Sequence, residues 1–150
     1  MPYSTAEAQQ HLLDDLALAI DEIGVALTAL GEAYEALDEG SGDRLEAELF
    51  RPVQVVYARM QRTHAGFAER HRLPTRTFAP SSRPARGARE QLDSALEAIE
   101  EADHLLVEIQ DSMMPVEVGD AELRAGLAHA RELVGPLPNR GRELARVLGR

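Results

Sequence analysis

The sequence predicts an all-α fold: an antiparallel up-down-up-down four-helix bundle. Four long segments carry apolar residues at alternating steps of three and four, a heptad-like spacing that places one apolar stripe along each helix. Glycine or proline separates the segments, and 150 residues are enough to bury one core. Two long hairpins exchanged between the subunits of an intertwined dimer would give the same pattern.

The first predicted helix covers residues 5–39. Its apolar positions keep the three-and-four spacing for most of that length, and Ser4 with Glu7 forms a capping box at the N-terminus. Two glycines within residues 40–42 follow at the place where the helix is expected to end.

The second predicted helix covers residues 43–72 and has Asp43 as its candidate N-cap. Pro52 lies inside it, lacks a backbone N–H and clashes with the preceding turn. We therefore expect a kink or restart near residues 50–52, where the apolar register also slips by one residue. Residues 73–87 contain three prolines and no acidic residue, which predicts an extended loop.

The third and last predicted helices complete a single domain over residues 1–150. Asp120 is the candidate N-cap of the last helix, and Pro136 and Pro138 break that helix while the apolar register continues through them. The predicted bounds are 88–113 for the third helix, and 120–135 and 139–149 for the two halves of the last.

The composition excludes several classes of function. There is no cysteine, so disulfides, thiolate metal sites and cysteine nucleophiles are ruled out. No window approaches the roughly 18 apolar residues of a membrane span, and the N-terminal segment lacks a signal-peptide pattern, so we expect a cytoplasmic protein without membrane contact. Glu101 and His104 match the Glu-x-x-His spacing of di-iron bundles, but the helical register turns both outward, so we predict no metal and no cofactor.

Positive charge is concentrated in two segments of an acidic chain. The formal net charge is -10, yet residues 59–89 hold eight arginines and one acidic residue, and residues 139–150 hold four arginines and one glutamate. In the predicted bundle these segments meet at one end and form a basic pole. Such a pole suits an anionic small molecule or an acidic protein surface. The isoelectric point of about 4.9 and the absence of tryptophan argue against nucleic acid.

The candidate ligand-binding residues belong to this basic segment. His64 and His71 lie on the inward stripe of the second helix, and the residues expected opposite them, Ala88, Ala95 and Gly141, are small enough to leave a cavity. The alternative is a core stripe that ends in half-buried histidines, with arginine stems or the loop filling the space. The predicted ligand-binding set is His64, Phe67, His71, Arg72, Arg76, Arg83 and Arg86.

Arg59 and His64 have the Arg-x4–6-His spacing. With the number of helices, this resembles HEPN domains, four-helix bundles of which many are metal-independent ribonucleases. The resemblance implies His64 as general base on a ribose hydroxyl, Arg59 as the group that stabilises the phosphorane charge, and a dimer. Because no strong catalytic motif occurs, we predict a non-enzymatic binding or interaction module, with the ribonuclease as the alternative. We also expect a homodimer, since a first helix of roughly 50 Å often outruns one narrow core.

Overall fold

The computed structural model describes residues 4–148, and no strand occurs among them, so the predicted all-α class is confirmed. Two of the long segments, the second and the last, are made of more than one helical piece. In chain order the elements are α1 (Thr5–Ala36), α2 (Glu39–Leu45), the π-helical turn η1 (Glu46–Phe50), α3 (Arg51–Arg70), α4 (Gly87–Asp111), α5 (Met114–Glu117), α6 (Ala121–Val134) and α7 (Leu137–Leu148).

The connection between the first two helices lies earlier in the sequence than expected. α1 begins at Thr5, and the hydroxyl of its N-cap, Ser4, accepts a hydrogen bond from the Glu7 N–H at 3.1 Å. It ends before residue 39 because Asp38 caps a new helix, its carboxylate accepting a hydrogen bond from the Ser41 N–H at 2.9 Å. Residues 40–42, expected to form the turn, therefore lie inside α2.

A π-helical turn joins α2 to α3 in one rod. The Arg51 N–H donates to the carbonyl of Glu46, five residues back instead of four. This wider turn accounts for the one-residue slip of the apolar register near Pro52. The proline itself lies in the first turn of α3, where a missing N–H is tolerated.

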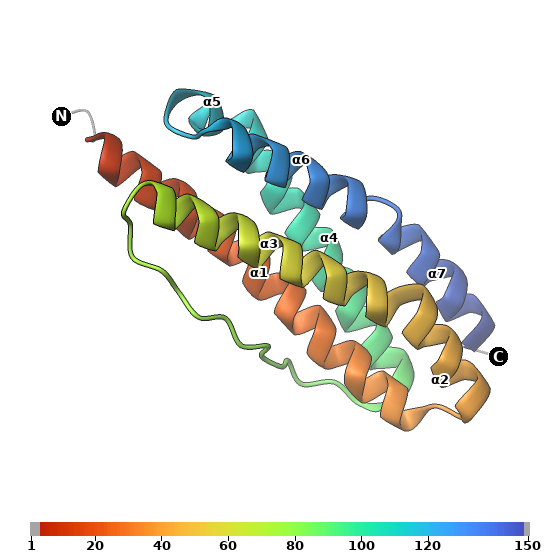
Figure 1. Ribbon diagram of the computed structural model, residues 1–150. Coiled ribbons are helices and arrows are strands. Elements are labelled where there is room, and N and C mark those ends of the chain that lie inside the picture. The colour runs from red at the N-terminus through yellow and green to blue at the C-terminus, as the bar shows by residue number, and fades with distance from the viewer. Residues whose placement is uncertain (1–3, 149–150) are drawn as a thin grey trace.

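The helix directions differ from the predicted alternation. α3 ends beside the start of α1, where His71 Nδ1 lies 3.2 Å from Gln9 Nε2. α4 begins beside the end of α1, where Gln91 donates a hydrogen bond to Glu32. Residues 71–86 therefore cross the length of the molecule, and α3 and α4 run in the same direction (Figure 1). The up-down-up-down order is wrong for the third helix, because so long a loop can reach either end of the molecule.

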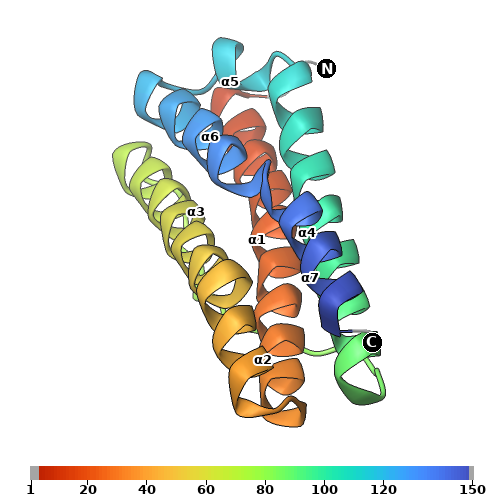
Figure 2. The ribbon, with the colours of Figure 1, turned by 90° about the vertical axis from the view of Figure 1, so that its right-hand side faces the viewer.

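Every neighbouring pair of rods is nevertheless antiparallel. α1 packs against α3 and α4, while α6 leans toward α3 and α7 toward α4 (Figure 2). α7 and α4 approach closely at Gly141, where a Cβ would lie 2.1 Å from Leu96 Cδ2. One side of α1 is buried from Leu12 to Ala33, so a single chain covers the helix that was expected to outrun its core.

The last rod follows the expected cap but breaks at one point. Asp120 caps α6 by accepting a hydrogen bond from the Leu123 N–H at 2.8 Å. The break falls at Gly135 and Pro136, whereas Pro138 lies in the first turn of α7. α5 was not predicted, and residue 149 lies outside the described residues. No described helix combines the length and apolar character needed to cross a bilayer.

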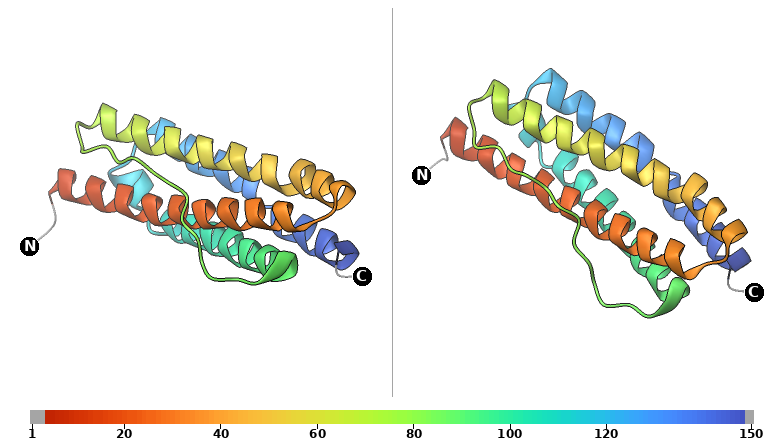
Figure 3. Two further views of the ribbon diagram at one scale, coloured as in Figure 1. Left: turned by 90° about the horizontal axis from the view of Figure 1, so that it is seen from below. Right: turned by 60° about the horizontal axis from the view of Figure 1, so that its bottom comes forward.

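We call residues 71–86 the strap. They are almost entirely extended and run across α1 from the end of α3 to the start of α4 (Figure 3). Two close contacts hold the strap against the helices: Phe78 packs edge-on against His64 at a centroid distance of 5.1 Å, and Pro80 lies over Gly24. A Cβ at Gly24 would lie 3.3 Å from Pro80 Cα, so the glycine permits this approach.

Candidate functional site

The inward residues of the predicted site belong to the core. His64 is 4% exposed and Phe67 is fully buried. Burial lowers the pKa of His64; Arg76 adds to the effect, and Asp14 opposes it. The ring of Phe78 fills the space that was predicted to be a cavity. The small residues at 88, 95 and 141 do not face these rings, because α4 begins, and α7 ends, at the opposite end of the molecule (Figure 1).

His71 joins three elements. Its Nε2 lies 2.8 Å from Asp120 Oδ2, and its Nδ1 faces the side-chain amide of Gln9. The same amide donates to the carbonyl of Val118 at 3.1 Å. Because the Gln9 amide donates to Nδ1, the hydrogen-bonding partner of Asp120 is the Nε2–H of His71. His71 therefore connects α3 to the starts of α1 and α6 and is not free to face a ligand.

The strap arginines lie against the acidic face of α1. Arg76 Nη2 lies 3.0 Å from Asp21 Oδ1 and its guanidinium stacks over Phe78, 4.5 Å from the ring centroid. Arg83 Nη2 lies 2.6 Å from Glu22 Oε1. These two predicted ligand-binding residues thus hold the strap in place.

The basic pole does not form. Arg72 and Arg86 are exposed on the strap at opposite ends of the molecule, Arg72 with a left-handed φ of 56°. The described C-terminal arginines lie on α7, which packs along the first half of α4, away from His71: Arg142 pairs with Glu100, and Arg89 of α4 donates to the carbonyl of Ala145. Arg150 lies outside the described residues. The expected pole required α4 to start at the end where α3 stops, and the crossover separates these segments.

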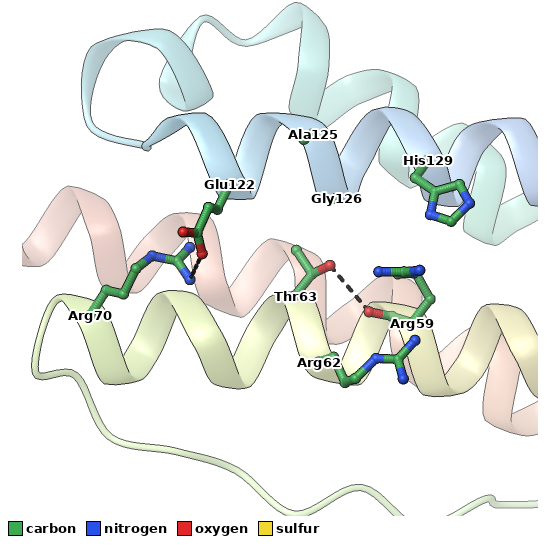
Figure 4. Close-up of a pocket in the computed structure, with 8 residues that line it drawn as sticks. All are labelled: Arg59, Arg62, Thr63, Arg70, Glu122, Ala125, Gly126 and His129. Carbon is green, nitrogen blue, oxygen red and sulfur yellow. Dashed lines mark hydrogen bonds and ion pairs between the residues drawn. The ribbon is translucent and has the colours of Figure 1, made fainter.

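A groove between α3 and α6 is lined by three arginines and a histidine. We call it the basic groove; its volume is about 450 Å³ (Figure 4). The two helices approach closely where Thr63 faces Gly126, since a Cβ at Gly126 would overlap Thr63 Oγ1. The lining residues are Arg59, Arg62, Thr63, Arg70, Glu122, Ala125, Gly126 and His129.

The two ends of the groove differ in charge. At one end the guanidinium groups of Arg59 and Arg62 lie beneath His129 (Figure 4). At the other end Arg70 donates from Nε to Asp120 at 2.8 Å, and its Nη1 lies 2.7 Å from Glu122 Oε2. These contacts hold the pKa of Asp120 far below its usual range, the hydrogen bond from Arg70 being the largest cause.

Arg59 and Arg62 have no carboxylate partner. Within residues 4–148, neither guanidinium lies within 4.0 Å of an acidic oxygen. The Nε of Arg59 is also buried without a hydrogen-bond partner in this part of the chain. Two adjacent uncompensated cations stand out in a chain with a formal net charge of -10. This end of the groove therefore carries uncompensated positive charge.

Sequence reasoning found only part of this groove. The helical register correctly predicted that Arg59 and Arg62 lie away from the core. It could not predict which residues of another helix face them. Gly126 was the available signal, because an isolated glycine inside a helical pattern often marks a close approach of two backbones. Glu122 and His129 had no such signal, since both read as surface residues of α6.

The residues of the ribonuclease alternative lie on different sides of α3. Arg59 lines the basic groove, while His64 is buried beneath Phe78. Glu101 and His104 do not form a metal centre with neighbours, for no group of three or more potential ligands occurs among the described residues.

Comparisons with protein-family models, curated proteins and solved structures return no match. The basic groove itself therefore carries the functional inference.

Proposed function

We propose that this protein is a non-enzymatic, helical binding module that takes up an anionic group of a ligand or partner in the basic groove. Its architecture would be an antiparallel four-helix bundle with a crossover strap. The observation that carries the proposal is the pair of unpaired guanidinium groups, Arg59 and Arg62, at one end of a cavity of about 450 Å³.

The ion pairs of the arginines favour the groove over the strap as the anion-binding site. Arg76 and Arg83 already have carboxylate partners on α1. Arg72 and Arg86 are exposed at opposite ends of the strap, so they do not act together on one ligand. In the groove, by contrast, two adjacent guanidinium groups, which donate to anionic oxygens in a fixed fork, face a space large enough for a ligand.

The test is a thermal-unfolding titration with inorganic phosphate and with polyglutamate at low ionic strength. Binding to the folded state alone adds about 2.7 kcal/mol at a hundredfold excess over Kd, so we expect a saturable rise in Tm for at least one probe. The variant Arg59→Gln/Arg62→Gln should lose this rise, because amide side chains keep hydrogen bonding but carry no charge.

The matched control is Arg44→Gln/Arg146→Gln. These arginines form exposed ion pairs within their own helices, outside the groove, and such pairs contribute little to stability. This variant should respond to the anion like the unmodified protein. Equal responses of all three proteins, or no response from any, would remove the support for the proposal.

Two further expectations stay open beside this proposal. A ribonuclease would need Arg59 and His64 to act on one phosphodiester, and nothing in a single chain brings them together; loss of RNA cleavage in His64→Ala would be its signature. Homodimerisation also remains a prediction, although the buried length of α1 removes one reason for it.

A further inference from the structure

The charge pattern of the basic groove selects for a short anion. The end with Arg59, Arg62 and His129 offers donors and positive charge, whereas at the other end the charge of Arg70 is compensated by ion pairs with Glu122 and with Asp120, which is not among the lining residues. The side chain of Glu122 is 74% exposed. An anion that fills the first end therefore meets no uncompensated positive charge if it extends along the groove.

This pattern disfavours an extended polyanion. A nucleic-acid backbone or an acidic peptide would carry its next charges toward the ion pair of Arg70 and Glu122, where no uncompensated positive charge would receive them. No phenylalanine, tyrosine or tryptophan lines the groove, so His129 offers the one ring among the lining residues on which a base could stack. A compact ligand avoids both problems.

The two guanidinium groups suit a phosphoryl group better than a carboxylate. Arg59 and Arg62 lie three residues apart on α3, which separates their backbones by roughly 4.5 Å along the helix axis. Each guanidinium can donate two parallel hydrogen bonds, so the two forks together present four donors and two positive charges. A phosphate monoester presents three terminal oxygens and up to two negative charges, whereas a carboxylate has two oxygens and one charge.

The rest of the ligand would meet a small, partly polar surface. Ala125 and Gly126 leave room above the point where α6 touches Thr63. Beyond them, the exposed carboxylate of Glu122 can accept hydrogen bonds from hydroxyl or ammonium groups. This acceptor lies at the opposite end of the groove from the unpaired guanidinium groups (Figure 4).

We propose that the basic groove binds a compact phosphate monoester with hydrogen-bond donors, the phosphoryl group between Arg59 and Arg62 and a donor group facing Glu122. This inference rests on the proposed function, that the groove binds an anionic group, and adds the class of ligand. It assigns Glu122 as a specificity residue and Arg59 and Arg62 as the phosphate-binding residues.

The experiment is isothermal titration of the protein with four probes: glycerol 1-phosphate, methyl phosphate, glycerate and a single-stranded oligonucleotide. We expect glycerol 1-phosphate to bind more tightly than methyl phosphate by roughly 3- to 10-fold, the usual range for one added hydrogen bond. Glycerate should bind more weakly than both phosphates, because it supplies one carboxylate in place of the phosphoryl group.

Three variants separate the parts of the site. Arg59→Gln/Arg62→Gln should abolish binding of both phosphates, and Arg59→Lys/Arg62→Lys should weaken it, because lysine keeps the charge but not the fork. Glu122→Ala should remove the preference for glycerol 1-phosphate over methyl phosphate and strengthen binding of the oligonucleotide. Circular dichroism of each variant checks that the helices are retained.

The outcomes distinguish this inference from the proposed function. If the oligonucleotide or polyglutamate binds in an Arg59- and Arg62-dependent way while small phosphates do not, the groove still binds anions but the compact-ligand inference is overturned. If glycerol 1-phosphate and methyl phosphate bind equally and Glu122→Ala changes neither, the role of Glu122 is overturned. If the arginine variant alters the binding of no probe, both proposals fall.

Discussion

At the scale of single residues, the face of α3 on which a side chain lies decides what it can do. His64 and Phe67 point into the core, and Arg59 and Arg62 face the basic groove. The helical period places these residues on different faces, so the sequence was sufficient to separate them. It was not sufficient to show that Phe78 of the strap covers His64, because no periodic pattern connects a loop residue with its contact.

The buried imidazole of His64 should make stability depend on pH. Its pKa is lowered in the folded state by burial, so the unfolded chain binds the proton more tightly. The resulting stability is present above the ordinary histidine pKa of about 6.5 and is lost as the pH falls below it. His64→Leu should remove this contribution, which has a slope of at most about 1.4 kcal/mol per pH unit.

The measurement for His64 is urea unfolding of both proteins between about pH 7 and about pH 5, a range centred near the ordinary histidine pKa. The other histidines are present in both proteins, so their contributions to the pH dependence of the free energy of unfolding cancel when the two slopes are compared. Parallel stability curves would show that His64 does not contribute.

At the scale of elements, the strap is held in place by side chains spaced along it. Arg76 and Arg83 pair with α1, and Phe78 is the partly buried hydrophobic residue between them. Proline content and the lack of periodicity were enough to predict an extended segment. They could not predict its path, which depends on the half-buried carboxylates of Asp21 and Glu22 on α1, with which the strap arginines pair.

Removing the Phe78 ring should loosen the strap. Phe78→Ala should reduce the free energy of unfolding by about 1–2 kcal/mol, less than the 3–5 kcal/mol of a fully buried phenylalanine. It should also speed tryptic cleavage after Arg76 and Arg86, since proteolysis needs a detached, extended segment. Thr77→Ala, an exposed change in the same loop, is the control. Equal cleavage rates in both variants would contradict a fastening role for Phe78.

At the scale of the whole molecule, helix direction was the feature least accessible to sequence reasoning. An apolar stripe shows which face of α4 is buried, but the same face would be buried whichever way the helix runs. Short turns settle the question for α1 and α3, which must be antiparallel. The strap leaves it open, and the basic pole was wrongly predicted for that reason.

A cysteine pair would test the crossover directly, because the chain has no native cysteine. Ala33 and Ala88 line one small apolar pocket, so Ala33→Cys/Ala88→Cys should form an intramolecular disulfide or react with a short bismaleimide. Ala6→Cys/Ala88→Cys should not, because Ala6 and Ala33 are separated by roughly 40 Å along α1. Gel mobility after oxidation is the readout.

The reverse result, linkage of Ala6 but not Ala33 to position 88, would support the alternating bundle. A cross-linked band of twice the chain mass would indicate the intertwined dimer.

The crossover also has a consequence for the order of folding. The strap separates the chain into two helical hairpins, α1 with α3 and α4 with α6 and α7, each closed by a short connection. Contacts within each hairpin are closer in sequence than those between α1 and α4, so the hairpins should form first and then dock. The time to collapse into the native state would then depend on the docking of two preformed halves, and the strap would set how often they meet.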